Sequence, residues 1–309
     1  MRRVGRLLAA SAGLATVAGF AGRCWFCELL GHFRVHYAAI LLAAAVGLVL
    51  RRRLRAAVLM LALALVNLSL ILPLYVRPAA PVLSSGPPVR AMLINLHTPS
   101  TAYQRMREAI HRVHPDILML VELGREWHRQ LAPELAGYAS EYVLRDDNFG
   151  IGIFSRAPIL SSNIVYAGAA GAPSVVATVA LDGRLLTIVG THPWSPVTPR
   201  RTALRDDQLE AVAELVARRR GPVMVLADLN TTSWSPVFRR FLRRTALRDS
   251  RLGFGVQPTW PALLGLAAVP IDHCLVSPEI AIEDRRTGPP VGSDHLPVIV
   301  DFRLEGPAT

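Results

Sequence analysis

The stretch VGSDHLPVIV, residues 291–300, places Ser293, Asp294 and His295 directly before a run of apolar residues. Such a run is typical of a strand that enters a buried core. Ser and Asp are common turn residues, so the stretch alone fits an ordinary loop before a strand equally well. Whether these polar residues have a chemical role depends on what the other strand ends of the chain carry.

Apolar strands and amphipathic helices alternate through the C-terminal part of the chain. Two helices are expected, one with Tyr103, Met106 and Ile110 on one face and one over about residues 202–219. An Asp182-Gly183 pair predicts a hairpin turn. Strands mixed with helices and hairpins indicate an α/β domain with mixed or antiparallel sheets. The expected strands cover residues 89–95, 116–122, 150–154, 174–180, 185–191, 223–227, 271–276 and 297–302.

Polar residues recur at the ends of six of these strands. Any one of them is more often a turn or capping residue than a functional group. A sheet, however, gathers its strand ends in one place, so acids, amides and imidazoles at six ends predict a common site. His273 follows Asp272 on a strand and is expected to point the other way, as a structural residue. The remaining candidates are Asn95, His97, Glu122, His192, Asp228, Asn230, Asp272, Asp294 and His295.

The chemistry of these side chains indicates phosphoester hydrolysis assisted by a metal ion. Asn95, Glu122 and Asp294 offer the hard oxygen atoms that Mg²⁺ and Mn²⁺ prefer. Asp228 and Asn230 are two residues apart on one strand, so a carboxylate base and an amide can address one water and one phosphate. An Asp paired with a His holds an oriented imidazolium, because the carboxylate fixes the tautomer and raises the pKa of the His.

Seven segments carry a resemblance to a known family. In order, INLH, LVELG, NFGIGIFSR, THPWSP, LADLN, TWP with PIDHCLVS, and GSDHLPV resemble the motifs of the endonuclease/exonuclease/phosphatase superfamily. The superfamily includes deoxyribonuclease I, abasic-site endonucleases, sphingomyelinases and inositol polyphosphate phosphatases. The match covers about residues 89–302. It implies an α/β fold of two packed mixed β-sheets flanked by helices, a four-layer sandwich.

The resemblance also implies which residues bind a metal ion and the substrate. Asn95 and Glu122 resemble the first metal-binding residues of the superfamily, and Asp294 resembles its C-terminal metal ligand, for Mg²⁺ or Mn²⁺. His97 stands where several nucleases have an acidic residue. The resemblance therefore does not establish a second carboxylate in the metal site. Asn148 and His97 are expected at the rim, as substrate-binding residues.

The catalytic roles follow from the same resemblance. His192 is expected to contact the scissile phosphate. Asp228 resembles the group that activates or orients the attacking water, and Asn230 the group that steadies the phosphate. His295 is expected to stabilise the pentavalent transition state, with Asp272 orienting its ring.

The N-terminal quarter is expected to lie in a membrane. Hydrophobic residues make up 51% of the chain and concentrate in Leu7–Gly22, Val35–Leu50 and Ala56–Val76. Only the third stretch reaches the roughly 20 residues that a spanning helix needs. A cleavable signal peptide is the alternative for the first stretch, although the later two would still tether the chain. The predicted parts are a membrane region with about three transmembrane helices at 1–76, a Pro-, Ser- and Gly-rich linker at 77–88, and a catalytic domain at 89–309.

Arginines around the apolar stretches predict the topology. Residues 1–76 carry a net charge of +8 of the total of +11, so most of the basicity is a topology signal rather than a nucleic-acid footprint. Arginines before the first stretch and between the second and third are expected in the cytoplasm. In this orientation the third span places everything after Val76 outside the cytoplasm. The chain is therefore expected in the inner or plasma membrane of a bacterium as a multi-pass protein with an extracytoplasmic site. These arginines are Arg2, Arg3, Arg6, Arg51, Arg52, Arg53 and Arg55.

The sequence leaves three alternatives for the function and its substrate. On the outer side of a membrane, a tethered phosphoesterase would meet lipid-linked phosphates or pyrophosphates, and superfamily members with similar N-terminal spans are associated with cell-envelope functions and glycopeptide resistance. A nuclease is the second alternative, since residues 218–220 and 239–248 are rich in Arg, although such runs also fit solvated helix faces. The third is a non-catalytic domain that binds phosphate groups or a partner protein. The sequence does not indicate an oligomeric state.

Overall fold

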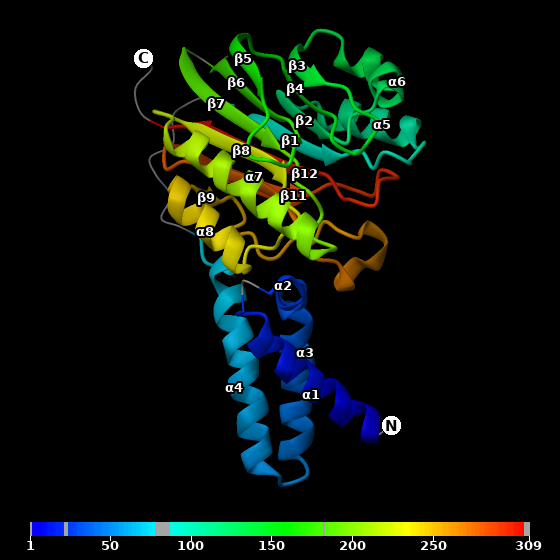
Figure 1. Ribbon diagram of the computed structural model, residues 1–309, viewed down its shortest axis with the longest axis vertical. Helices are drawn as coiled ribbons and strands as arrows, with labels where there is room; N and C mark the ends of the chain where they lie inside the picture. Colours follow the sequence, from blue (N-terminus) through cyan, green and yellow to red (C-terminus); the bar gives the residue numbers. More distant parts are fainter. Residues whose placement is uncertain (1, 22–23, 78–86, 182, 306–309) are drawn as a thin grey trace.

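The computed structural model describes residues 2–21, 24–77, 87–181 and 183–305. Most of the predicted linker at 77–88 and residue Asp182 of the predicted hairpin turn lie outside the described residues. A set of helices forms one end of the molecule, and an α/β sandwich forms the other (Figure 1). The two are connected by the segment that follows the last N-terminal helix.

The N-terminal helices begin with α1 (Arg2–Ala18) and α2 (Trp25–Gly31). α3 (Arg34–Val49) and α4 (Leu54–Ile71) run side by side as an antiparallel hairpin, and the 3₁₀ turn η1 (Leu72–Tyr75) continues α4 (Figure 1). α2 lies at the top of this hairpin, against the sandwich, while α1 crosses it obliquely.

Fewer helices than expected are suited to crossing a membrane. Among the described residues, the segment Leu54–Tyr75 is long and apolar enough, and α2 with α3 would be a second candidate only if this pair, bent by 64°, forms one span. α1 has 17 residues and includes three arginines near its start, which leaves too few apolar residues for a span of about 20. The expectation of three spans is therefore not confirmed.

Two six-stranded mixed sheets form the sandwich. In the first sheet, β1 and β2 are parallel and the other neighbours are antiparallel; in the second, β7 and β8 are the parallel pair. The first has the order β11 (Ile280–Thr287), β12 (Val298–Leu304), β1 (Val89–Asn95), β2 (Ile117–Val121), β4 (Ile151–Ser155), β3 (Ala139–Val143). The second has the order β5 (Ile159–Val165), β6 (Ser174–Leu181), β7 (Arg184–Thr191), β8 (Val223–Asp228), β10 (Asp272–Val276), β9 (Arg248–Asp249).

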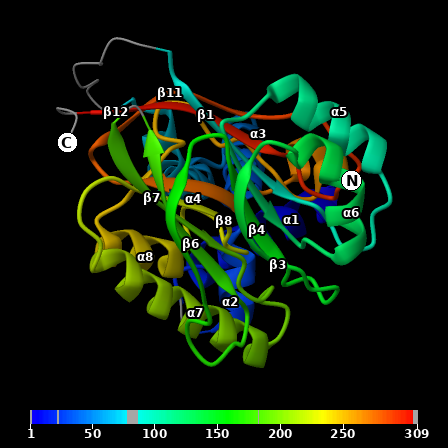
Figure 2. The same cartoon turned by 90° about the horizontal axis from the view of Figure 1, so that it is seen from above.

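Helices cover the outer face of each sheet (Figure 2). α5 (Tyr103–Val113) and α6 (Arg125–Leu135) pack on the first sheet, and α7 (Pro199–Ala217) and α8 (Pro236–Thr245) pack on the second. Successive strand residues face opposite sides, so Met92 of β1 packs under α5 while Leu93 lies between the sheets. The expected four-layer α/β sandwich is confirmed.

The sequence missed the elements that carry the weakest apolar pattern. β3 and β5 lie on sheet edges with mostly exposed or half-buried residues, so neither shows an apolar run. α8 contains all the arginines of the 239–248 stretch except Arg248, which begins β9, and Phe238 and Phe241 occupy the buried face of the helix. Arg240 and Arg243 are exposed on the other side of α8, as a solvated helix face predicts.

Candidate active site

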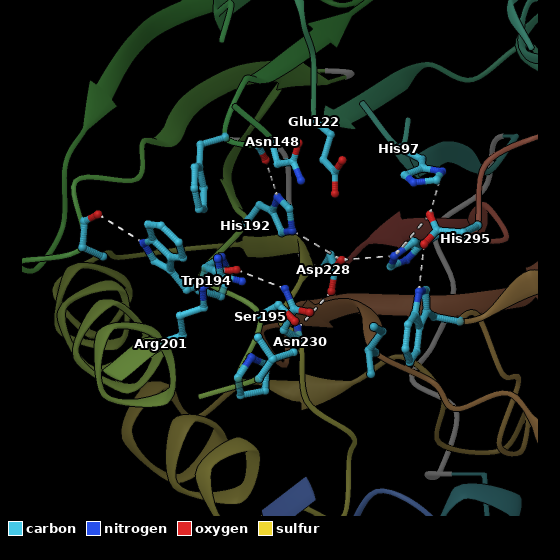
Figure 3. A pocket seen from close by; sticks show the side chains of 18 of the residues that line it. His97, Glu122, Asn148, His192, Trp194, Ser195, Arg201, Asp228, Asn230 and His295 are labelled. Carbon is cyan, nitrogen blue, oxygen red and sulfur yellow. Dashed lines mark hydrogen bonds and ion pairs between the residues drawn. The ribbon is translucent and has the colours of Figure 1, made fainter. Parts of the chain in front are cut away.

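Strand ends bring the predicted polar residues together at one end of the sandwich (Figure 3). Asn95 is the last residue of β1 and Asp228 the last of β8, while Glu122 and His192 directly follow β2 and β7. Asp272 begins β10, and its Cα pairs with that of Asp228 across the antiparallel ladder. Glu122, His192 and Asp228 line a pocket of about 570 Å³, and Asn95 and Asp272 lie directly behind it.

Left-handed backbone conformations aim several of these side chains. His97, Glu122, Asn148 and Asn230 have φ angles of 58°, 59°, 71° and 52°, and they are half of the eight non-glycine residues with positive φ in the described part of the chain. This conformation is unfavourable for residues with a Cβ and persists where the surroundings hold it, often at functional sites. The backbone is therefore strained around this pocket.

Asp228 lies at the centre of the site, between His192 and His295 (Figure 3). Its Oδ1 accepts a hydrogen bond of 2.9 Å from the backbone N–H of Asn230, and its Oδ2 accepts one of 3.1 Å from Asn95 Nδ2. Burial and the nearby Asp272 carboxylate raise the pKa of Asp228 to about 6, although the two histidines oppose the rise. A carboxylate with this pKa can accept a proton near neutral pH.

A second carboxylate holds the ring of His295. Asp272 Oδ2 lies 2.9 Å from His295 Nδ1, and the backbone carbonyl of Asp272 accepts a hydrogen bond of 3.3 Å from Arg285 Nη2. Burial alone would lower the pKa of His295, but the carboxylates of Asp272 and Asp228 raise it to about 10. His295 is therefore an imidazolium at neutral pH, with Nε2 directed at Asp228 Oδ2 across 3.7 Å.

The ring of His192 is held in one orientation on the other side of Asp228. Its Nδ1 lies 3.1 Å from the carbonyl oxygen of Asn148, which can only accept, so Nδ1 carries the hydrogen. Its Nε2 lies 3.5 Å from Asp228 Oδ2. Asn230 lies below this pair and donates its side-chain Nδ2 to the carbonyl of Pro193 at 3.0 Å, which fixes the amide.

The predicted metal ligands offer a suitable set of oxygen atoms. Glu122 is 8% exposed, and the charge of His192 and hydrogen bonds from Thr98 and Asn95 outweigh its burial and lower its pKa. Asp294 also lines the pocket, with Oδ1 3.4 Å from His97 Nδ1 and the side chain 38% exposed. Two carboxylates beside an amide offer the hard oxygen atoms that fit a divalent cation such as Mg²⁺.

A neighbouring acidic group fits a metal ion less well. Donor atoms of Asp228, Asp272 and His295 lie within 4.8 Å of one another. However, Nδ1 of His295 is bonded to Asp272, and a protonated imidazole has no lone pair for a cation. The oxygen set of Glu122, Asn95 and Asp294 is therefore the better candidate for the metal site.

Aromatic and arginine side chains form a wall that the sequence analysis did not single out. Arg201 lies over the ring of Trp194, 5.2 Å from its centroid, and Arg145 lies over Phe149 at 5.7 Å. Arg145 also pairs with Asp147. No described carboxylate pairs with the Arg201 guanidinium, which comes from the first turn of α7 and lines the pocket (Figure 3). This wall can bind a second anionic group.

The N-terminal part of the chain supplies another wall of the pocket. Leu29 and His32 line it from the end of α2, and Nε2 of the buried His32 has no hydrogen-bond partner among the described residues. α2 is held there by Glu28, whose Oε2 lies 2.5 Å from Nη2 of the fully buried Arg205 in α7. No local motif marks these residues, because only the tertiary fold brings α2 to the site.

The structure brings all ten predicted site residues to this region. Asn95 and Asp272 lie behind the pocket and contact its lining residues. His273 points away from the pocket, as expected, with Nε2 2.7 Å from the carbonyl of Thr231. The other eight, His97, Glu122, Asn148, His192, Asp228, Asn230, Asp294 and His295, line the pocket itself. Their individual roles stay predictions.

Comparison with solved structures finds the same fold in several proteins. An endonuclease/exonuclease/phosphatase from Bacteroides vulgatus is similar with a TM-score of 0.60 and 19% identity, covering 70% of this chain and 99% of that one. Humanized D. rerio TDP2 is similar with a TM-score of 0.59 and 17% identity, covering 70% of this chain and 98% of that one. The human Nocturnin catalytic domain with bound sulfate gives 0.58 and 19%, covering 72% and 97%.

Comparison of the sequence gives the family. No curated protein sequence matches the chain. The family model described as Endonuclease/Exonuclease/phosphatase family matches residues 92–295, which is about two thirds of the chain and runs from β1 to His295. The protein therefore belongs to the endonuclease/exonuclease/phosphatase family.

Proposed function

We propose that the chain is a divalent-metal-dependent hydrolase of phosphoester or pyrophosphate bonds, with a lipid-linked phosphate as substrate. The observation that supports the chemistry best is the arrangement of Asp228 between two histidines, with Asp272 behind His295. It combines one proton acceptor with one permanent proton donor in a single pocket. Family membership adds that the chain belongs to proteins that hydrolyse phosphate or phosphodiester bonds.

Asp228 serves as the general base in this proposal. Its carboxylate is held from behind by the side chain of Asn95 and the backbone of Asn230, so it is oriented before substrate binds. With a pKa of about 6 it is mostly ionised at neutral pH and can take a proton from an attacking water. Asn230 can steady a phosphate oxygen beside that water.

The two histidines stabilise the charge that develops on the phosphate. His295 keeps its Nδ1 proton bonded to Asp272, so the Nε2 proton is free for a phosphoryl oxygen in the pocket. His192 presents Nε2 from the opposite side of Asp228. When bound by Glu122, Asn95 and Asp294, Mg²⁺ or Mn²⁺ would supply further charge stabilisation as a Lewis acid.

The chemistry is tested by phosphate release from the full chain in detergent with Mg²⁺ or Mn²⁺. The panel contains lipid pyrophosphates, lipid monophosphates, phospholipids and DNA. We expect metal-dependent turnover that His295→Ala abolishes, while His111→Ala, at an exposed histidine on α5, leaves it unchanged. Turnover that both variants retain would overturn the proposed site, and turnover of no panel member would favour a phosphate-binding domain.

A lipid-linked substrate is proposed because of what surrounds the pocket. Leu29 and His32 of α2 form part of its wall, and α2 is followed directly by α3 and α4. The segment Leu54–Tyr75 is apolar enough to cross a bilayer. A phosphate on a membrane-bound lipid would therefore lie close to the site, whereas a preference for DNA in the panel would show the enzyme to be a nuclease.

We also propose that the site faces the extracytoplasmic side of the inner or plasma membrane. The arginines that precede α1 and those between α3 and α4 support this orientation through the positive-inside rule. An alkaline phosphatase fused after the C-terminus should then be active in cells. An inactive phosphatase fusion, together with a fluorescent fusion of green fluorescent protein at the same position, would place the site in the cytoplasm.

A further inference from the structure

An apolar loop with exposed leucines borders the pocket and has no function in the proposal so far. The loop runs from Trp260 to Val269 and contains the 3₁₀ segment η2 (Ala262–Ala267). Leu263 and Leu266 are 92% and 96% exposed, the highest values among the large apolar residues of the described chain. The whole loop contains no charged residue.

The base of this loop is fixed to the active site. Trp260 and Val269 form an isolated β-bridge that closes the loop, and both line the pocket. Nε1 of Trp260 donates to Asp294 Oδ2 at 3.0 Å, and the backbone N–H of Ala262 donates to the Asp294 carbonyl at 2.7 Å. The leucines therefore extend from a base that is bonded to a predicted metal ligand.

The tip of the loop lies beside the N-terminal helices. His36, in the first turn of α3, has Nε2 3.1 Å from the carbonyl oxygen of Leu266. In Figure 1 the segment, in orange, lies at the end of the sandwich that faces α2 and α3. The exposed leucines are thus at the level where α3 begins, next to the most apolar helices of the chain.

We infer that this loop inserts Leu263 and Leu266 into the bilayer surface beside α3 and holds the mouth of the pocket against the lipid. The inference rests on the proposed membrane anchoring. A lipid surface fits better than a protein partner, because the loop is uncharged and continuous with helices that are themselves exposed and apolar. The phosphate of a membrane lipid then enters between α2 on one side and the loop on the other.

Insertion is measured without reference to activity. The full chain with Cys24→Ser and Cys27→Ser retains only Cys274, which is fully buried. Leu266→Cys in this background is labelled with a polarity-sensitive fluorophore and placed in lipid nanodiscs. The matched control is Leu160→Cys on β5, 60% exposed, in a strand at the far end of the sandwich from the helices (Figure 1).

We expect lipids brominated in their acyl chains to quench the fluorescence of the probe at 266 and to leave that of the probe at 160 unchanged. Iodide in the water should quench the probe at 160 and leave the probe at 266 unchanged. Equal iodide quenching at both positions and no effect of brominated lipids would overturn the inference. So would protection of the probe at 266 that depends on protein concentration in lipid-free detergent, since it would assign the loop to contacts between copies. Neither result depends on whether the chain hydrolyses phosphate.

A second measurement connects the loop to the substrate. In the double variant L263E/L266E we expect kcat/KM for a lipid phosphate in bilayers to fall at least about 10-fold, because two inserted leucines are replaced by charges. A water-soluble, short-chain analogue should be hydrolysed as by wild type, and L160E should change neither rate. Equal losses on both substrates, or no loss on either, would contradict the inference, whereas inactivity of wild type on both would count only against the proposed function.

Discussion

At the scale of single residues, the state of His295 depends on Asp272. The carboxylate holds Nδ1 at 2.9 Å and contributes to the pKa of about 10. In Asp272→Asn the amide keeps the shape but loses the charge, so His295 should lose its proton at lower pH. We expect kcat to fall about 100-fold at neutral pH and the basic limb of its pH profile to move to lower pH. The measurement is the pH dependence of kcat for phosphate release.

The control for this variant is Asp284→Asn, which removes a carboxylate that is 46% exposed and pairs with Arg286 on a sheet edge. It should leave kcat and its pH profile unchanged. An Asp272→Asn enzyme with wild-type kcat and an unmoved basic limb would show that Asp272 has no positioning role for His295.

We propose that Arg201 distinguishes substrates with one phosphate from substrates with two. Its guanidinium lies over Trp194 in the pocket wall without a described carboxylate partner, so it is free for a second phosphate. We expect Arg201→Ala to lower kcat/KM for a lipid pyrophosphate by about 10- to 100-fold, the effect of one charged hydrogen bond, and to change the monophosphate rate little. Arg200→Ala removes a neighbouring exposed arginine and should affect neither; an equal loss on both substrates in Arg201→Ala would contradict this role.

The predicted and the missed site residues differ in how they reach the pocket. Asn95, Asp228 and Asp272 stand at the ends of apolar runs, which the sequence displays and the sheets necessarily gather. Arg201 and His32 come from a helix start and a helix end, where nothing local indicates the direction of a side chain. Their position follows only from how α7 and α2 pack on the sandwich.

At the scale of elements, sequence patterns predicted the buried strands and failed at sheet edges. β1, β2, β8 and β12 are mostly buried on both faces, because each packs between the opposite sheet and a helix or loop layer. Edge strands such as β3 bury few residues, so their sequences resemble those of loops. α1, α3 and α4 were predicted as apolar runs, whereas α2 and its contact with the sandwich were not.

That contact depends on a buried ion pair between α2 and α7. Glu28 bonds Arg205 Nη2 at 2.5 Å and accepts a hydrogen bond from Ser235 Oγ at 3.0 Å. Glu28→Ala would leave a buried guanidinium with Asp206 as its one described carboxylate partner, so we expect a loss of about 3 kcal/mol in the free energy of unfolding. Thermal unfolding of the full chain in detergent measures it.

Glu126→Ala is the control, because Glu126 forms an exposed ion pair with Arg129 and accepts an exposed hydrogen bond from Gln130, both within α6. Its unfolding temperature should equal that of wild type. If Glu28→Ala also unfolds at the wild-type temperature, the ion pair does not hold α2 on the sandwich.

A buried histidine within β10, His273, should make the stability of the fold depend on pH. Burial and the adjacent Arg251 lower the pKa of His273 to about 3, whereas in the unfolded chain it keeps its ordinary value of about 6.5. Between these values the unfolded chain binds one more proton than the folded one, so stability falls as the pH falls below about 6.5. At about pH 5 the loss in the free energy of unfolding is about 2 kcal/mol, because each pH unit below about 6.5 contributes about 1.4 kcal/mol.

His273→Gln removes this titration while keeping an acceptor for Arg251 and a donor for Thr231. Between about pH 7.5 and about pH 5, we expect the free energy of unfolding of the variant to fall by about 2 kcal/mol less than that of wild type. Urea unfolding of both proteins in detergent gives the comparison. Equal losses in the two proteins would assign the acid sensitivity to other groups.

At the scale of the whole molecule, the pocket lies where the sandwich meets the N-terminal helices. α2 closes one side of it, and the Trp260–Val269 loop closes another. A hydrolase for a soluble phosphate would gain nothing from a site bordered by these segments, whereas a lipid substrate would be presented there by the bilayer itself. The arrangement of the two parts therefore supports the proposed substrate class in a way that neither part does alone.

The most direct test of this account is Mg²⁺-dependent phosphate release by the full chain in lipid nanodiscs that contain a lipid pyrophosphate. We expect turnover that stops when EDTA is added and returns with excess Mg²⁺. Asp228→Asn should lower its rate about 1000-fold, and Asp284→Asn should leave it unchanged. Turnover that survives EDTA, or that Asp228→Asn leaves intact, would contradict a metal-dependent site built around Asp228.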